Sequence, residues 1–448
     1  MTAPLTFGMF QTMGLSGSWR LPDNTTPGFL TLDYWTTLAK RSEEAGVDFL
    51  FIADDFGYPL IDGEVSPTAV EHALLFPRGD PSMVMSAMAA ATEKLGLVVT
   101  MSTSADRPPA LARRMATLDH VTNGRIGWNV VTGAGQNASA RLFGEPMKAH
   151  DDRYAAAEDY LKLAMTLWEG SWEDGALKVD RAAGVYADAA MVHEIHYDGT
   201  HFRSDGVFTV PPSPQRTPLL FQAGASTKGR DVAARYAEAV FLAAEPDAVR
   251  EQIADIRARA VAAGREPDAI KFLIAGTYVV APTHDEALAL RETVTAFVTT
   301  ADAAVQYAFF TGLDLTKMDP SKPLQSTASE QGRTNIERFT GEDAPTVGEI
   351  LEEFRVNGVM SRPFLGTPAE AVDQTVALME HTGADGVLVQ PGPTGDSASF
   401  FELVVPELKR RGLMEGPAQA TTLRERLFPA GSAHLPPSHP GHALRVGR

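Results

Sequence analysis

The chain has 448 residues, with 39 Lys and Arg against 57 Asp and Glu, which gives a formal net charge of −18. Neutralising phosphates requires a basic surface, so this balance argues against a nucleic-acid partner. Cysteine is absent, which excludes disulfides, thiolate metal sites and cysteine nucleophiles. We find no secretory signal and no apolar run of about 20 residues, so we expect a soluble cytoplasmic protein that does not enter a membrane.

Apolar runs of strand length alternate with helical patterns along most of the chain. Most of these runs are apolar throughout, which is typical of parallel strands covered on both faces. They span residues 6–10, 47–53, 95–101, 126–131, 219–222, 239–243, 270–280 and 386–390. Eight strands, each followed by a helix or a longer excursion, favour a (β/α)8 barrel, or TIM barrel. A doubly wound open sheet is the alternative, but no Gly-x-Gly-x-x-Gly follows the first run.

A barrel of this type needs about 250 residues, so the surplus must lie in insertions. We assign residues 1–428 to a single barrel domain, with insertions at about 169–217, before the fifth strand, and about 300–365, before the eighth. The first insertion is rich in Asp-Gly turn signals and ends in a cluster of prolines. Residues 429–448 contain Pro and His without an apolar period, so we expect this tail to be extended or mobile.

The C-terminal ends of the strands hold the active sites of (β/α)8 barrels, so polar residues at these ends are candidates. The second strand ends in Asp54 and Asp55. We expect Asp54 to hydrogen-bond a ligand and Asp55 to be solvated, with a helix cap or turn as the alternative. Ser102, after the third strand, either caps the next helix or donates to a ligand. Asn129 lies inside the apolar fourth strand, where its amide needs a partner: a planar heterocycle or a neighbouring strand.

The segment after the fifth strand suggests an anion site. It reads QAGASTKGRD, small residues followed by the start of a helix. Small residues let a backbone approach a ligand, and a helix start offers unpaired N–H groups. Ser226 can add its hydroxyl, and His150 and Tyr154 begin the helix after the fourth strand. Together these residues indicate a phosphate site, although a plain strand–turn–helix connection has a similar pattern.

Three histidines, His193, His196 and His201, lie close together in the first insertion. They lack the spacing of a known metal motif, and a turn-rich insertion offers little rigid geometry. We therefore expect no metal site. The sequence also lacks a Gly-x-Ser-x-Gly elbow, so serine hydrolysis has no support.

Four stretches make the sequence resemble the flavin-dependent monooxygenases of the bacterial luciferase-like superfamily, in the nitrilotriacetate, pristinamycin synthase and dibenzothiophene-sulfone monooxygenase branch. These stretches are 112–133 with GRIGWN, 150–168 beginning HDDRY, 218–241 with QAGAS, and LVVPELKRRGL followed by TTLRERL. They occur in order and reach to about Leu427. Two positions depart from the family pattern: Gly133 replaces a common Ser, and Tyr197 stands at a customary His position.

The resemblance implies a (β/α)8 barrel that binds reduced FMN at its C-terminal mouth. The positions that match the family around the isoalloxazine and ribityl groups are Asp54, Ser102, Asn129 and Thr132, and those on the phosphate side are His150, Tyr154, Ala225 and Ser226. The apolar residues Met9, Phe10 and Phe56 are expected to line the substrate pocket and shield it from water. No catalytic residue is assigned from the sequence.

The implied reaction is a two-component monooxygenation, in which FMNH2 and O2 oxidise a small organic substrate through a flavin peroxide adduct. A separate NAD(P)H:flavin reductase supplies the FMNH2. Two other functions stay open: hydride transfer with a flavin or deazaflavin on the same fold, and non-catalytic flavin binding. We expect a homo-oligomer, with neither nucleic acid nor membrane as a partner.

Overall fold

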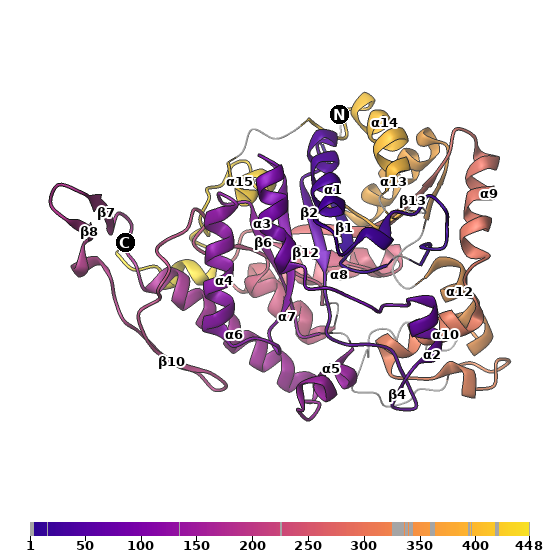
Figure 1. Ribbon diagram of the computed structural model, residues 1–448, viewed down its shortest axis with the longest axis horizontal. Coiled ribbons are helices and arrows are strands. Elements are labelled where there is room, and N and C mark those ends of the chain that lie inside the picture. Colours follow the sequence, from indigo (N-terminus) through magenta and orange to yellow (C-terminus); the bar gives the residue numbers. More distant parts are fainter. Residues whose placement is uncertain are drawn as a thin grey trace.

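The computed structural model describes residues 4–15, 17–133, 135–224, 226–324, 336, 339, 344–358, 363–392, 395, 397–416 and 421–447, with the backbone alone for His150. Eight parallel strands close a barrel (Figure 1). They are β1 (Thr6–Thr12), β2 (Phe49–Ala53), β5 (Gly96–Ser102), β6 (Ile126–Val131), β11 (Leu219–Gln222), β12 (Ala239–Leu242), β13 (Lys271–Val280) and β15 (Gly386–Val389). Pairing follows this order and returns from β15 to β1. The predicted (β/α)8 barrel and its eight strands are therefore confirmed.

A layer of helices surrounds the barrel. It consists of α1 (Leu32–Ala45), α3 (Ser82–Ala91), α4 (Pro108–Val121), α6 (His150–Gly170), α7 (Thr227–Tyr236), α8 (Pro246–Ala262), α13 (Pro368–Thr382) and α14 (Val405–Arg410). Local sequence sets where these helices begin. Proline occupies the first turn of α4, α8 and α13, where a missing N–H costs nothing, and Thr367 with Glu370 forms a capping box on α13.

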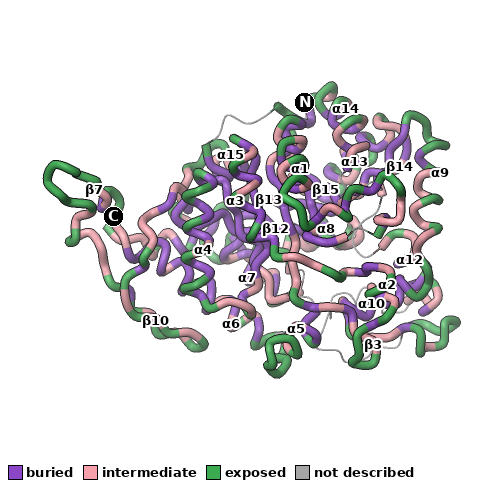
Figure 2. The backbone as a smooth tube through the Cα atoms, in the orientation of Figure 1, coloured by how far each residue is buried: buried purple, intermediate pink, exposed green. Residues whose placement is uncertain are grey.

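Two apolar layers make up the core. Phe10, Phe51 and Phe221 point into the barrel, whereas Met9 packs in the layer between barrel and helices. Side chains alternate across a strand, so neighbours on β1 face opposite layers. The lower end of the barrel is closed by α15 (Leu423–Leu427), whose two leucines belong to the interior cluster. Figure 2 shows this buried centre beneath more exposed helices. The barrel can therefore open only at its C-terminal end.

The two predicted insertions take different forms. The first contains two hairpins, β7 (Leu177–Asp180) with β8 (Val185–Ala187) and β9 (Ile195–Asp198) with β10 (Arg203–Gly206), which project from the body at the left of Figure 1. The second contains α10 (Thr300–Thr311), α12 (Val347–Asn357) and β14 (Pro363–Gly366), which extends the sheet beside β13. Helix α10 packs against α12 and α2 (Pro67–His72), at the lower right of Figure 1. The remaining elements are β3 (Leu60–Ile61), β4 (Glu64–Val65), α5 (Gln136–Phe143) and α9 (His284–Thr295).

The C-terminal tail differs from the expected extended segment. Residues 440–444 form a short 3-10 helix that packs against α6 and α7. His439 is 1% exposed, and its Nε2 lies 2.9 Å from the carbonyl oxygen of Tyr236. Leu435 is buried as well. The prolines therefore shape a compact turn on the helical layer, which an absent apolar period does not reveal.

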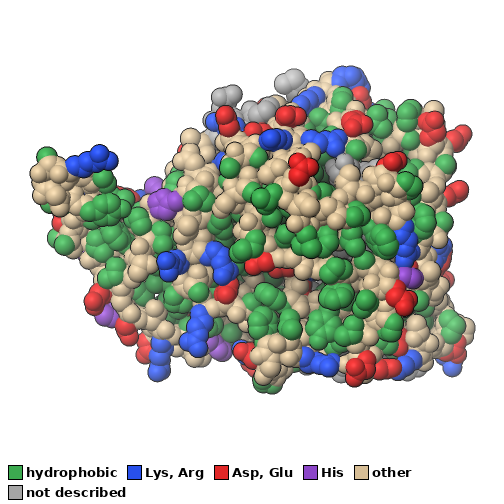
Figure 3. Space-filling view, viewed as in Figure 1, with side chains coloured by type: hydrophobic (Ala, Val, Ile, Leu, Met, Phe, Trp, Pro, Cys, Tyr) green, Lys and Arg blue, Asp and Glu red, His purple; other side chains and the backbone are tan. Residues whose placement is uncertain are grey.

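The surface carries charges of both signs. On the face seen in Figure 3, the Lys and Arg side chains of the described residues are dispersed among acidic and apolar ones. No helix in the described part of the chain combines the length and hydrophobicity needed to cross a bilayer.

Candidate active site

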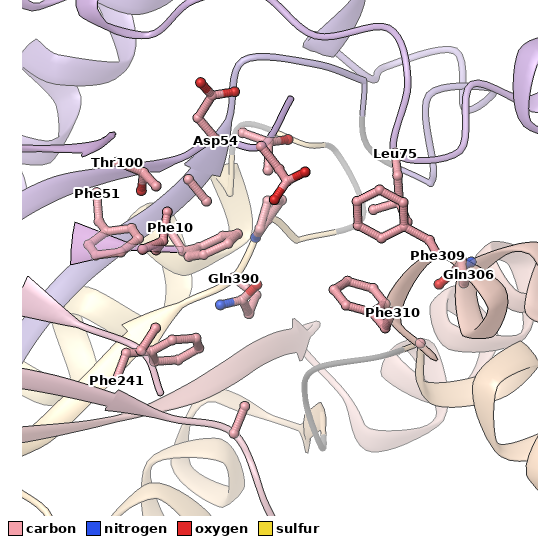
Figure 4. A pocket seen from close by; sticks show the side chains of 18 of the residues that line it. Phe10, Phe51, Asp54, Leu75, Thr100, Phe241, Gln306, Phe309, Phe310 and Gln390 are labelled. Carbon is pink, nitrogen blue, oxygen red and sulfur yellow. The ribbon is translucent and has the colours of Figure 1, made fainter. Parts of the chain in front are cut away.

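A cavity of about 730 Å³ opens at the C-terminal ends of the barrel strands. This volume lies within the usual range of small-molecule and cofactor sites. Two surfaces face each other across it (Figure 4). We call the first the barrel floor: Phe10, Phe51, Thr100, Asn129, Gln222, Phe241 and Gln390, all from strands or strand ends. We call the second the α10 wall: Leu75, Arg78, Gln306, Phe309 and Phe310, from α10 and the loop before α3.

Buried amide groups on the barrel floor lack partners. Asn129 on β6 is the register partner of Thr100 on β5, and its Nδ2 donates to the Thr100 Oγ1 at 2.9 Å. The Asn129 Oδ1 is buried without a hydrogen-bond partner among the described residues, as are Gln222 Oε1 and Gln390 Nε2. Nearly all buried polar groups in proteins are paired. Two acceptors and one donor left open on one floor fit a ligand with a hydrogen-bonding edge.

The turn from β11 to α7 offers a second binding surface. Ser226 is the N-cap of α7, and its Oγ accepts a hydrogen bond from the Gly229 N–H at 3.1 Å. Gly224 leaves the backbone open here, because a Cβ would lie 3.0 Å from the Tyr154 hydroxyl and 2.2 Å from Gln222 Nε2. Tyr154, Gly224 and Ser226 all line the cavity. Free N–H groups at a helix start, a hydroxyl and a phenol form a suitable cradle for a phosphate.

Charged groups lie at the rim between the two surfaces. Burial raises the pKa of Asp54 to about 6, although the nearby Arg78 guanidinium opposes this shift. Burial also lowers the pKa of Arg78, against the attraction of Asp55 and Asp54. The Asp54 carboxyl can therefore change its protonation state near neutral pH, where it can either accept or donate a hydrogen bond.

Asp55 does not have the expected solvated position. Its Oδ1 accepts hydrogen bonds from the backbone N–H groups of Gly57, at 2.5 Å, and Gly135, at 3.2 Å. Two segments far apart in the sequence are thereby joined beside the cavity. This carboxylate stabilises the loops that frame the rim, while its neighbour Asp54 lines the cavity itself.

The structure brings most of the predicted residues together. Those that line the cavity are Phe10, Asp54, Asn129, Thr132, Tyr154 and Ser226. Ala225 and the His150 side chain lie outside the described residues; the His150 backbone starts α6, the helix that also carries Tyr154. The roles of these residues in binding stay predictions.

Three predicted residues lie elsewhere. Met9 is fully buried between the barrel and the helices, because it faces outward on β1. Phe56 is 43% exposed and packs edge-on against Phe143, with 5.1 Å between ring centroids, outside the cavity lining. Ser102 is also absent from the lining, and its Oγ lies 2.8 Å from that of Ser104. Thr100, two residues earlier on the same strand, takes the place expected for Ser102.

The sequence interpretation missed the residues of the α10 wall. Arg78 lies in a loop, and Phe309 and Phe310 belong to an insertion helix, so no strand-end rule selects them. Gln222 carries a weak signal, a polar residue closing an apolar strand. Among the described residues, no cluster of three or more potential metal ligands is present. His193 and His196 pair instead with Glu173 and Asp205, at 2.7 and 2.9 Å.

A closed barrel with a polar-rimmed cavity at its strand ends defines an enzyme of the (β/α)8 class. The model of the luciferase-like monooxygenase family matches residues 8–386. The chain therefore belongs to the luciferase-like monooxygenases, as the sequence resemblance indicated.

Relatives and solved structures agree with this assignment. The long-chain alkane monooxygenase of Geobacillus thermodenitrificans is 38% identical over 94% of this chain and 93% of its own. The dimethyl-sulfide monooxygenase of Hyphomicrobium sulfonivorans is 36% identical over 96% and 90%. A riboflavin lyase crystallised with modified FMN and riboflavin superposes with a TM-score of 0.94 at 43% identity, covering 99% of this chain and 100% of that one. The named branch is present too, with nitrilotriacetate, dibenzothiophene-sulfone and pristinamycin IIA enzymes at 34%, 33% and 30% identity.

Proposed function

We propose that this chain is the oxygenase of a two-component system that uses FMNH2 and O2 to oxidise a small organic substrate. The observation that carries the proposal is the set of unpaired amide atoms on the barrel floor, beside an anion cradle at the β11–α7 turn. An isoalloxazine ring offers donors and acceptors along one edge, and its ribityl phosphate provides the anion. The residues present therefore fit FMN.

Each part of the site receives a role in this proposal. Asn129, Gln222 and Gln390 hydrogen-bond the ring, while Phe10, Phe51 and Phe241 support it from below. Ser226, Tyr154, His150 and the Ala225 backbone hold the phosphate, with the start of α7 adding its dipole. Asp54, Thr132 and Ser102 are assigned to the ring and ribityl side. Ser102 is the weakest of these assignments, because its hydroxyl is engaged with Ser104 outside the lining.

Bound reduced flavin supplies two electrons to O2, so that one oxygen atom enters the substrate and the other leaves as water. The residues of this chain orient the reactants and keep bulk water out. Phenylalanine side chains make up much of both surfaces of the cavity, which suits that purpose. A separate NAD(P)H:flavin reductase delivers the FMNH2. The nitrilotriacetate and pristinamycin IIA relatives support a partner of this kind, since their names describe each as one part of a larger enzyme system.

Two measurements test the proposal. Anaerobic titration of the purified protein with dithionite-reduced FMN should show saturable binding, and oxygen uptake with a generic flavin reductase should yield an oxygenated product. Binding without any oxygenated product from a panel of sulfides, aromatic acids and flavins contradicts it and favours hydride transfer or a non-catalytic flavin protein. Failure to bind reduced FMN rejects all three.

A second candidate is oxidative cleavage of riboflavin. It is favoured by the riboflavin lyase structure, whose TM-score of 0.94 and 43% identity exceed the 0.91 and 36% of the long-chain alkane monooxygenase structure. Chromatography of a reaction with riboflavin, FMNH2 and O2 tests it directly. Loss of the ribityl chain supports this candidate, and unchanged riboflavin beside oxidation of another substrate excludes it.

A further inference from the structure

The α10 wall is built from segments that do not belong to the barrel. Phe309, Phe310 and Gln306 project from α10 toward the strand ends, and Leu75 reaches the same space from the loop before α3 (Figure 4). If FMN lies on the barrel floor, this wall bounds the remaining space. Its side chains then decide what can lie against the flavin.

Arg78 brings a positive charge with uncommitted donors to this wall. Its guanidinium carbon lies 5.8 Å from the centroid of the Phe309 ring. Among the described residues, its guanidinium makes no hydrogen bond, although the carboxylates of Asp54 and Asp55 lie near enough to oppose the loss of its proton. A guanidinium presents five N–H donors in a plane. Arg78 is therefore held charged at the cavity with donors available for a ligand.

The two phenylalanines add an aromatic corner. The ring centroids of Phe309 and Phe310 are 5.0 Å apart, and the ring planes meet at 87°. One ring thus offers its face where the other offers its edge. Aromatic rings pack on faces and edges at such separations, so a flat ring in this corner can contact both.

We propose that the α10 wall is the substrate subsite, selective for a flat fused-ring heterocycle that carries carbonyl oxygens along one edge. The ring lies against Phe309 and Phe310, and an edge oxygen accepts from Arg78. Gln306, with both a donor and an acceptor, can pair with a neighbouring imide group. This inference rests on the proposed function, because FMN must occupy the barrel floor.

The same geometry separates this chain from two of its relatives. A long-chain alkane or dimethyl sulfide, the substrates in those relatives' names, offers no oxygen acceptor. Either one would cover Arg78 while leaving its donors without water or partner, which weakens binding. A carbonyl-edged ring replaces the displaced water with a charge-assisted hydrogen bond. The guanidinium therefore disfavours purely apolar substrates.

Lumichrome, a three-ring heterocycle with an imide edge and no ribityl chain, is a suitable probe. It is titrated into protein saturated with FMN, with FMN retention followed by ultrafiltration. We expect saturable binding, at least tenfold weaker in Arg78→Met and about fivefold weaker in Phe309→Leu. Both variants should retain the wild-type FMN affinity within twofold. Arg78→Lys should recover part of the loss, since it restores one donor.

A matched control is Arg20→Met. Arg20 also lies over an aromatic ring, 5.5 Å from Trp19, but outside the cavity lining. It should bind lumichrome like the wild type, and thermal unfolding should confirm that all variants fold. The inference is overturned if FMN-loaded wild type does not bind lumichrome, if Arg78→Met binds it unchanged, or if decane competes for the site. A tenfold loss of FMN affinity in Arg78→Met assigns the guanidinium to the flavin instead.

The failures of the two proposals are distinguishable. Absence of reduced-FMN binding or of oxygenated product removes the proposed function. Normal FMN binding and oxygen transfer, together with lumichrome binding that ignores Arg78, removes only the substrate subsite.

Discussion

The barrel floor and the α10 wall face the same cavity but are made differently. The floor comes from hydrogen-bonded strands whose register fixes neighbours such as Thr100 and Asn129 side by side. The wall comes from an insertion helix and a loop, held by packing of α10 against α2 and α12. The floor is thus suited to an unchanging cofactor, whereas the wall can be altered without disturbing the barrel. Substitutions on the two surfaces should have separable effects.

The largest effect is expected at the strand–helix turn, where Gly224→Val places a side chain in the phosphate cradle. A Cβ there already lies 3.0 Å from the Tyr154 hydroxyl and 3.1 Å from the Gly229 Cα. We expect FMN affinity to fall at least 100-fold, about 2.7 kcal/mol, as measured by equilibrium titration. Gly416→Ala is a control, since nothing lies within 4 Å of the added Cβ. Retained FMN affinity in Gly224→Val contradicts the assignment of the cradle.

A smaller loss is expected on the floor itself from Asn129→Leu. This change removes the Asn129 Oδ1 acceptor and leaves Thr100 without its donor. The loss of a hydrogen bond to the ring should weaken FMN by about 2 kcal/mol, and binding of riboflavin should fall equally because the phosphate is not involved. Calorimetric titration with both ligands measures this. A loss confined to FMN places Asn129 beside the phosphate rather than the ring.

The contrast between floor and wall also explains what the sequence predicted. Parallel strands leave continuous apolar runs, so the barrel was readable, and Asn129 was conspicuous inside one of them. An apolar run does not reveal which of its residues point inward, so Met9 was wrongly placed in the pocket while its neighbour Phe10 lines it. Nothing in the pattern of residues 300–365 shows which helix covers the mouth, and Phe309 and Arg78 were therefore missed.

Asp54→Asn tests the charge at the rim between the two surfaces. Burial raises the pKa of Asp54 from 3.8 to about 6, so the folded protein holds this proton more tightly than the unfolded chain. Such a shift costs stability as the pH rises from about 4 to 6, and the full cost is present above that range. We expect Asp54→Asn to increase the free energy of unfolding by about 2 kcal/mol at pH 7.5 and to change it little at pH 4.

Denaturant unfolding at the two pH values measures this difference, and lower stability of the variant at both contradicts it. The same variant should weaken binding of reduced FMN at pH 7.5, where Asp54 is a carboxylate acceptor. The phosphate of FMN has its own ionisation near pH 6. The pH profile of the variant therefore supplies the baseline against which the contribution of Asp54 is read.

The smallest effects should come from Tyr154→Phe and Ser226→Ala. Each removes one hydroxyl from the phosphate side and should weaken FMN by about 1 kcal/mol, while leaving riboflavin affinity unchanged. Ser226 also caps α7 through the Gly229 N–H, so its variant should lose about 1 kcal/mol of stability as well. Thr367→Ala removes the N-cap of α13, away from the cavity, and controls for that loss. If Thr367→Ala weakens FMN as much as Ser226→Ala does, the effect comes from general destabilisation and the phosphate assignment fails.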